Sequence, residues 1–189
     1  MKIRARHPDH GGSVPLVTSP EDGAMFVTCA ADYAQHTGWA FKVTHQKDVT
    51  SQNICTLSWT VPYIAEHTHV HMKYTVLCEG EAEVAFYEDV KITANTGTAK
   101  VPICANRATP KVSALAAAYA DATLNIVDAT LLDVEVVGNG YQNGGRSNSL
   151  LNWTLCAGKS YALVVKNQTG QANEITIKLD CYRHTEVTE

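Results

Sequence analysis

Residues 67–78, HTHVHMKYTVLC, show an alternation of polar and apolar side chains. Successive side chains of a β-strand point to opposite faces, so this pattern predicts a strand with one packed face and one face that is wet or lies at an interface. The residues predicted for the packed face are Val70, Met72, Tyr74, Val76 and Cys78. Those predicted for the other face are His67, His69, His71, Lys73 and Thr75.

The segment that follows repeats the alternation. After the turn signal Glu79-Gly80, residues Glu81–Glu88 place Ala82, Val84 and Phe86 on one face. Two alternating runs joined by a short turn are typical of a β-hairpin, so we expect these two strands to pair with each other.

Strand-like runs continue through most of the chain, between turn signals. They are Ala24–Cys29, Trp39–His45, Ile54–Tyr63, Leu151–Cys156, Tyr161–Val165 and Ile175–Cys181. The Gly/Asn-rich segment Gly138–Ser149 is predicted to be a flexible connection, with an exposed contact or receptor-facing loop as the alternative. In Ser113–Ala120 the alanines favour helix by propensity, although strand-like neighbours argue against a long one. Many short antiparallel strands predict an all-β fold, an antiparallel β-sandwich of jelly-roll type in a single domain.

The first 25 residues differ from the rest in composition. They are rich in Pro, Gly, Ser, His and charge, which is typical of a segment that stays mobile or docks on a neighbouring molecule. We therefore expect an N-terminal arm at 1–25 and a β-sandwich domain at 26–189. A domain of that size buries about 70% of the surface that its unfolded chain exposes, so it holds its own core.

The charge and hydropathy patterns argue against several partners. The formal net charge is −4, and Lys2, Arg4 and Arg6 form the one short basic cluster, whereas nucleic-acid binding normally needs a concentrated basic surface. No apolar run approaches the ~20 residues that span a bilayer. The first residues also lack the apolar core of a signal peptide. We expect no nucleic-acid or membrane partner, and synthesis in the cytoplasm.

Six cysteines are spread along the chain without any C-x-x-C pair, which excludes zinc ribbons and thioredoxin-like motifs. They are Cys29, Cys55, Cys78, Cys104, Cys156 and Cys181. Two interpretations stay open: buried thiols that act as small apolar residues, or disulfides within or between chains. No pairing follows from the sequence, because six cysteines allow 15 intrachain pairings.

The histidines of the 67–78 strand are the strongest catalytic-looking feature. On a strand, residues two apart project to the same face roughly 6.5–7 Å apart, so two of His67, His69 and His71 could converge on one metal ion, as in cupin-like barrels. A metal enzyme would add a carboxylate and another histidine, for which Glu66 and His45 are available. The favoured interpretation is three histidines on the polar side of a half-buried strand or at a subunit contact, with no metal.

Other enzyme motifs are missing or incomplete. Ala157-Gly158-Lys159-Ser160 ends like a phosphate-binding P-loop, but Trp153 stands where the first glycine belongs and a strand-like run follows in place of a helix. We interpret this segment as a hairpin turn. No G-x-S-x-G motif occurs, so a hydrolase serine is unsupported. We expect a non-enzymatic protein without catalytic residues, cofactor or small-molecule substrate.

Several segments, taken in order, resemble capsid decoration proteins of tailed phages, also called cement proteins. The similarity covers roughly residues 26–183 and rests on the collinear order of its motifs. These are the run His67–Tyr74, GEAEVAFYE at 80–88, NTGTAKVP at 95–102, ANR at 105–107, GNGYQNGG at 138–145, WTL at 153–155, GKSY at 158–161 and VKN at 165–167. The Asn-Arg stretch is shorter than in the family, and the cysteines are more numerous.

The resemblance implies a structural virion protein on the exterior of a bacteriophage capsid. It implies a homotrimer that binds the major capsid protein and stabilises contacts between capsomers, with no reaction. The alternatives are another virion adhesion module, such as a head fibre base or a tail component, and a cupin-like metal-binding enzyme that uses His67, His69 and His71.

Overall fold

The structure is a computed structural model of the 189-residue chain. It describes residues 4–6, 13–18, 25–27, 34–63, 68–111, 113, 115–138, 145–148 and 153–185. Strands account for nearly all of the regular structure, and the one helical segment among these residues is a single turn at 34–36.

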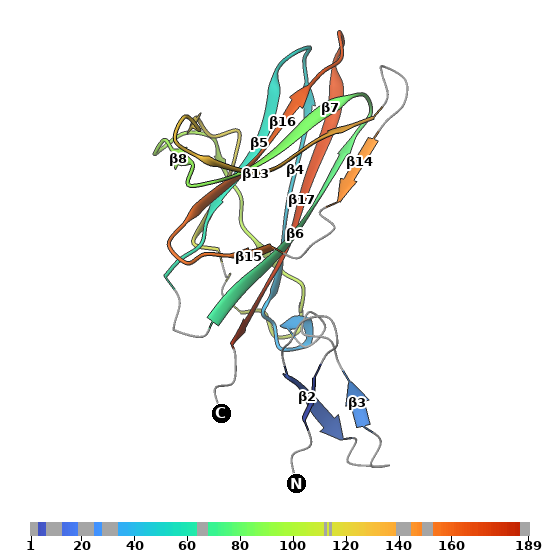
Figure 1. Ribbon diagram of the computed structural model, residues 1–189, viewed down its shortest axis with the longest axis vertical. Helices are drawn as coiled ribbons and strands as arrows, with labels where there is room; N and C mark the ends of the chain where they lie inside the picture. Colours follow the sequence, from blue (N-terminus) through green and yellow to red (C-terminus); the bar gives the residue numbers. More distant parts are fainter. Residues whose placement is uncertain are drawn as a thin grey trace.

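Two antiparallel sheets pack face to face (Figure 1). The first sheet has the order β10 (Ile103–Cys104), β4 (Ala40–Val49), β17 (Asn173–Thr185), β6 (Thr68–Cys78) and β14 (Gly145–Asn148), with β15 (Trp153–Leu155) also paired to β6. The second sheet has the order β13 (Thr130–Val137), β7 (Ala82–Glu88), β16 (Ser160–Asn167), β5 (Ile54–Thr60), β11 (Ala117–Ala120) and β9 (Thr98–Ala99). A short pair, β12 (Leu124–Asn125) and β8 (Lys91–Ile92), lies outside these sheets.

The connectivity is that of a jelly roll. The principal strands in chain order are β4, β5, β6, β7, β13, β14 with β15, β16 and β17. In the first sheet β4, β17, β6 and β14 with β15 lie side by side, which are the first, last, third and sixth of these strands. In the second sheet β5, β16, β7 and β13 lie side by side, which are the second, seventh, fourth and fifth. Such alternation between two sheets defines the double-sheet jelly roll, so the predicted all-β sandwich of jelly-roll type is confirmed.

The predicted hairpin of residues 67–78 with 81–88 is wrong. The strand β6 pairs with β14, β15 and β17, whereas β7 pairs with β13 and β16 in the other sheet. The turn at Glu79-Gly80 therefore carries the chain from one sheet to the other. The Gly158-Lys159 turn was also expected to close a hairpin, but it leads from β15 in the first sheet to β16 in the second. Alternation predicted that each segment is a strand. It could not show whether two consecutive strands pair by hydrogen bonds in one sheet or pack against each other from opposite sheets.

Two other segments also differ from expectation. Part of the predicted flexible connection Gly138–Ser149 is the strand β14, which pairs with the C-terminal end of β6. The alanine-rich run near Ser113–Ala120 contains the strand β11, and Ala118 and Ala120 pack their methyl groups inward. Burial against the facing sheet outweighs the helix propensity of alanine, which amounts to a few tenths of a kcal/mol per residue.

Aromatic rings fill the middle of the core. Trp59, Phe86 and Tyr161 come from three neighbouring strands of the second sheet, and the Trp59 ring centroid lies 5.9 Å from that of Phe86 and 6.1 Å from that of Tyr161. Tyr74 of the first sheet meets Phe86 at 5.9 Å, which links the two layers. The side chains predicted for the packed face of residues 67–78 are all buried, as expected.

A buried amide network fixes one end of the sandwich. The Asn167 side chain donates to the carbonyl oxygens of Val49 (2.8 Å) and Gln171 (2.7 Å), and its oxygen accepts from the backbone N–H and the hydroxyl of Thr169. Asn173 accepts from the backbone N–H of Gly80 at 2.9 Å. Both asparagines are fully buried, so the network ties connections from both sheets together.

The N-terminal segment forms a separate small sheet in its described parts. The backbone of β1 (Arg4–Arg6), β2 (Ser13–Thr18) and β3 (Met25–Val27) pairs in the order β1-β2-β3. It is drawn in blue at the lower end of Figure 1. The division of the chain into an arm at 1–25 and a domain at 26–189 stays a prediction.

Candidate functional site

The edge strand β13 presents three of its apolar side chains to solvent and its acidic side chains to the core, whereas Leu132 and Val137 pack inward. Val134 and Val136 are 52% and 60% exposed. Asp133 accepts a hydrogen bond from the buried hydroxyl of Tyr74 at 3.0 Å, and Glu135 accepts one from the buried hydroxyl of Ser147. This is the reverse of the usual arrangement of a half-buried strand, in which polar residues face water.

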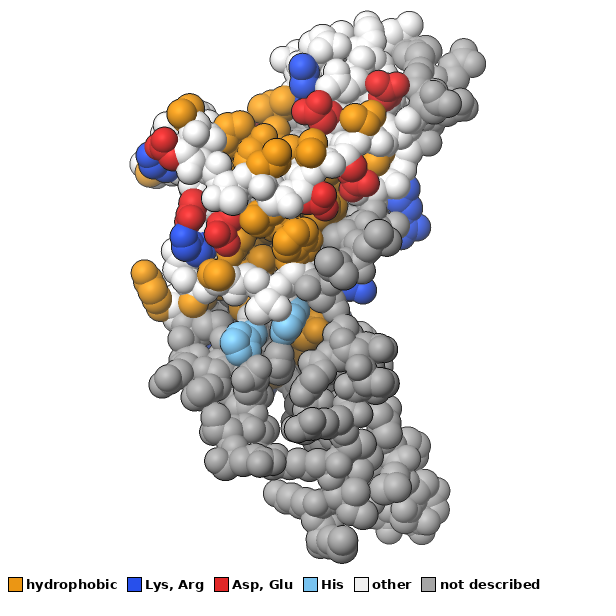
Figure 2. Space-filling model, viewed as in Figure 1, with side chains coloured by type: hydrophobic (Ala, Val, Ile, Leu, Met, Phe, Trp, Pro, Cys, Tyr) orange, Lys and Arg blue, Asp and Glu red, His pale blue; other side chains and the backbone are white. Residues whose placement is uncertain are grey.

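The exposed side chains of β13 continue an apolar surface across the second sheet. Register places Val134 beside Ala85 of β7 and Val164 of β16, and places Leu131 beside Tyr87 of β7. We call this surface the outer face, made of Leu131, Val134, Val136, Tyr87 and Val164, with the buried Ala85 between Val134 and Val164. Figure 2 shows hydrophobic side chains gathered over β13 and the strands behind it, with Asp and Glu side chains around them. A contiguous apolar patch with a polar border is typical of a protein–protein contact.

The edge of β13 is shaped against pairing with another strand. A register irregularity lies between Leu131 and Asp133, and the acidic side chains of Asp133 and Glu135 point inward next to it. Bulges and inward-pointing charges are features that protect sheet edges from adding a further strand. The surface therefore favours contact through the side chains of the outer face over contact through the backbone of β13.

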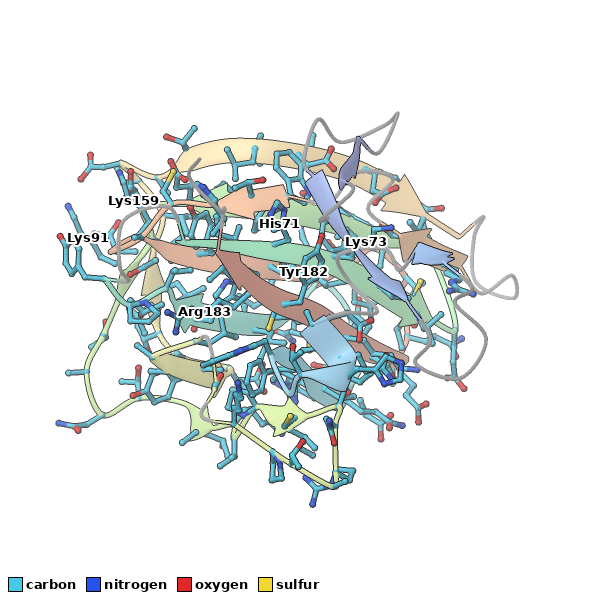
Figure 3. The ribbon with its side chains drawn as sticks, turned by 90° about the horizontal axis from the view of Figure 1, so that it is seen from below. His71, Lys73, Lys91, Lys159, Tyr182 and Arg183 are labelled. Carbon is cyan, nitrogen blue, oxygen red and sulfur yellow. The ribbon has the colours of Figure 1, made fainter. Side chains whose placement is uncertain are left out.

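The His-rich strand lies on the opposite sheet. His69 and His71 project from the side of β6 that faces away from the core, as the alternation predicted, and the His71 ring stacks on Tyr182 of β17 with centroids 5.0 Å apart. Figure 3 shows His71 and Tyr182 side by side. The His71 Nδ1 atom lies 3.2 Å from the hydroxyl of Thr154. Position 67 lies outside the described residues, so the three-histidine metal site stays a prediction.

His45, named above as a further ligand for that site, lies elsewhere. It is on β4, in register with Ile177 and Val76, and points into the core, whereas His71 points out of the sheet. There it meets two residues that sequence reasoning did not connect with it. One ligand atom each from His45, Cys55 of β5 and Asp121 lie within 4.8 Å of one another. Within the described residues this is the one group of three potential metal ligands.

The electrostatics of this group follow from its position at the rim of the core. Burial lowers the pKa of His45, although the carboxylate of Asp121 works in the opposite direction. Burial raises the pKa of the Cys55 thiol to about 12. Burial also acts to raise the pKa of Asp121, but hydrogen bonds from Lys47 and from the Thr56 backbone outweigh it, so the pKa is lowered. At neutral pH the group is a neutral imidazole, a thiol and a carboxylate.

Five of the six cysteines are described, and all five are free thiols. Cys55, Cys78, Cys104 and Cys181 are buried, and Cys156 is exposed in the turn before β16. Position 29 lies outside the described residues. Four of the five described cysteines are therefore buried thiols, as one of the two interpretations predicted, and Cys156 is an exposed thiol. Bonds between chains stay a prediction, and Cys156 is the described thiol that is accessible for one.

The turn that resembles the end of a P-loop is built around different contacts. Gly158 has a φ of +77°, the Lys159 amine pairs with Asp89, and the strand β16 follows. The lysine is therefore engaged by a carboxylate at the start of a strand, which is not the setting of a phosphate loop at a helix N-terminus.

The sequence has no match among protein-family models or among curated proteins. In the part of the chain that the structure describes, no helix has the length and hydropathy needed to cross a membrane.

The two features that the sequence analysis missed left different signals. The outer face was visible as the alternation of residues 131–137, LLDVEVV, but alternation alone does not say which set of side chains faces out. The approach of Cys55 to Asp121 left no signal, because the two residues lie 66 positions apart in sequence and meet only through the pairing of β5 with β11.

Proposed function

We propose that this protein is a structural component of a phage virion, which binds the exterior of the capsid as a homotrimer and stabilises contacts between capsomers. The observation that carries the proposal is the outer face, an apolar surface exposed on a rigid jelly-roll scaffold. The collinear motifs shared with capsid decoration proteins supply the class of assembly. Such a role needs a scaffold and adhesive surfaces, and it needs no reactive group.

The outer face packs against a second copy of this chain in the proposed trimer. Its three aliphatic side chains on β13 are half-exposed in the single chain, and the cores of subunit interfaces are more apolar than the rest of a protein surface. A border of opposite charges adds complementarity, since Val136, Glu83 and Lys166 lie in one row across β13, β7 and β16. In a ring of three copies, the Glu83 side of one border can face the Lys166 side of the next.

Trimer formation explains how modest contacts with a shell become stable attachment. Three subunits held together present three equal sets of contacts to a threefold position, and each further contact forms at a high effective concentration after the first. In this proposal residues 1–25 supply the shell contacts and the outer face supplies the subunit contacts.

The test is a pair of glutamates on the outer face. Val134→Glu with Val136→Glu adds two like charges to a half-exposed edge, which a folded monomer tolerates and an apolar subunit contact does not. Thr44→Glu is the matched control, because Thr44 is exposed on the outward side of β4 in the other sheet. Far-ultraviolet circular dichroism of all variants verifies that the strands have formed.

Two measurements decide the outcome. Analytical ultracentrifugation should give a trimer for the natural sequence and for Thr44→Glu, and a monomer for the double variant. Occupancy on purified capsids that lack the protein, measured by imaging of the particles, should be high for the first two and at least tenfold lower for the third. Full occupancy by the double variant, or failure of the natural protein to bind capsids, would refute the proposal. Imaging also separates a capsid position from one on a head fibre or tail.

A further inference from the structure

The His45–Cys55–Asp121 group lies between the two sheets, at the side where β4 and β5 face each other. His45 extends inward from the first sheet and Cys55 from the second, and the loop that follows β11 carries Asp121. The imidazole and the thiol are 7% and 0% exposed, whereas 32% of the Asp121 side chain is exposed. The group is therefore buried on two sides and open to solvent through its carboxylate.

The backbone holds Asp121 in place over β5. The Asp121 N–H donates to the Thr56 carbonyl at 2.9 Å, and the Asp121 Oδ1 accepts from the Thr56 N–H at 3.2 Å. Asp121 has a φ of +51°, a left-handed conformation that aspartate adopts more readily than most residues. These restraints leave Oδ2 to face His45, whose Nε2 lies 3.2 Å away.

His45 has a second, unsatisfied ring nitrogen. Its Nδ1 is buried and has no hydrogen-bond partner among the residues that the structure describes. Because Nε2 faces a carboxylate, Nε2 carries the proton of the neutral ring and Nδ1 holds the lone pair. An ion bound at Nε2 would move that proton to Nδ1, so Nε2 is the nitrogen that the ring offers to this group.

We propose that His45, Cys55 and Asp121 bind one zinc ion between the sheets. One sulfur, one nitrogen and one oxygen ligand form a mixed set that suits Zn²⁺, and a water molecule at the Asp121 side would complete a tetrahedron. When the ion binds, the Cys55 thiol loses its proton to the buffer, and the His45 proton moves from Nε2 to Nδ1 so that Nε2 can coordinate. The thiolate and the carboxylate together balance the two positive charges.

The distances in the unliganded chain are compatible with this ion. Zinc–ligand bonds of roughly 2.0–2.3 Å place ligand atoms of a tetrahedron about 3.3–3.6 Å apart. The separation of His45 Nε2 from Asp121 Oδ2, 3.2 Å, already has this size. Since all three ligand atoms lie within 4.8 Å of one another, closing the site around the ion needs a contraction of about 1.5 Å at most.

Lys47 is the competitor for the site. Its amine lies 3.0 Å from Asp121 Oδ2, and its side chain is 40% exposed. A zinc ion must displace this contact, which requires only that the lysine turn into solvent. Lys47 therefore weakens binding in the natural sequence without blocking it, and its removal should strengthen binding.

The proposal is tested on the full chain with Co²⁺ as a spectroscopic probe and with Zn²⁺. One Co²⁺ per chain should give visible bands of tetrahedral cobalt and a near-ultraviolet band from a thiolate ligand, and Zn²⁺ should abolish both. Free zinc at about 100-fold above its Kd should raise the melting temperature by about 5–10 °C. Lys47→Gln should bind Co²⁺ at least tenfold more tightly.

The variants assign the ligands. Asp121→Asn should weaken binding at least tenfold, and Cys55→Ser should remove the thiolate band. Two controls leave the site intact: Cys156→Ser removes the exposed thiol, and His69→Gln removes a histidine of the other candidate metal strand. Both should bind like the natural chain. Persistence of the thiolate band in Cys55→Ser, unchanged affinity in Asp121→Asn, loss of binding in His69→Gln, or no stoichiometric binding would each overturn the proposal. Because Asp121 lies at the rim, its variant remains informative if Cys55→Ser does not fold.

Discussion

Asn167→Ala should destabilise the protein more than the removal of one polar side chain usually does. Asn167 is completely buried at the end of β16, and its amide makes four hydrogen bonds shorter than 3 Å, two donated to backbone carbonyls and two accepted from Thr169. A fifth, longer bond of 3.5 Å is accepted from the Asn173 side chain. Alanine removes the four short bonds together with the longer one. The backbone N–H of residue 167 still donates to the Asn53 carbonyl, so the strand itself keeps its connection there.

The expected magnitude follows from the number of short bonds lost. Each contributes a net of about 1 kcal/mol, and groups left buried without a partner cost somewhat more, so the free energy of unfolding should fall by about 4 kcal/mol. For a domain of this size, each kcal/mol corresponds to roughly 2–4 °C, which gives a decrease in melting temperature of about 8–16 °C. The effect is larger than that of most single substitutions because three connecting segments lose their common anchor.

Urea unfolding followed by circular dichroism measures this change. The midpoint should fall while the slope of the free energy against urea stays the same, since the native fold is kept. Asn53→Ala provides the control: it removes the same side chain at the same end of the sandwich, but Asn53 is exposed and its main contact is to the hydroxyl of Thr50. That variant should lose less than about 1 kcal/mol. Equal losses in the two variants, or a loss below about 1 kcal/mol in Asn167→Ala, would refute the reasoning.

Three further predictions concern backbone strain, thiol reactivity and the arm. Gly97→Ala should cost about 2–3 kcal/mol in thermal or urea unfolding, because Gly97 has a φ of +74° and a Cβ there would lie 2.6 Å from a backbone oxygen. Gly170→Ala should be neutral, because no atom of the described residues lies within 4 Å of a Cβ at that position. Mass spectrometry of the natively alkylated protein should find Cys156 modified well before Cys181, because burial raises the pKa of the Cys181 thiol to about 12 and little thiolate exists at pH 8; equal rates would contradict the fold. Deletion of residues 1–25 should reduce capsid occupancy at least tenfold and leave the trimer intact in ultracentrifugation, and undiminished occupancy would remove the arm from the proposed shell contact.

The sequence predicted the strands because their periodicity is a local property. In β6 every second side chain is buried, and Val70, Met72 and Val76 are those that alternation selected. Strand pairing is not local. The partners of β6 come from the last third of the chain, and no pattern within residues 67–88 shows that β7 joins the opposite sheet. The short turn at Glu79-Gly80 is compatible with either arrangement.

The candidate sites depend on that same nonlocal information. The prediction that His69 and His71 lie on the outward side of a strand was correct, because it depended only on the two-residue periodicity of a β-strand. The orientation of β13 depends instead on inward partners for its acids, and these partners, Tyr74 and Ser147, come from two other strands. Likewise, only the completed sandwich brings Asp121 to Cys55 and His45.

The order of strands also bears on when the molecule becomes stable during synthesis. The middle of each sheet is occupied by one of the last two strands of the jelly roll, with β16 between β7 and β5, and β17 between β4 and β6. A nascent chain that stops before residue 160 has its flanking strands but no partner between them. The second sheet cannot close until β16 has been made, and the first sheet cannot close until β17 has been made. Until then the incomplete chain exposes unpaired edges that favour aggregation.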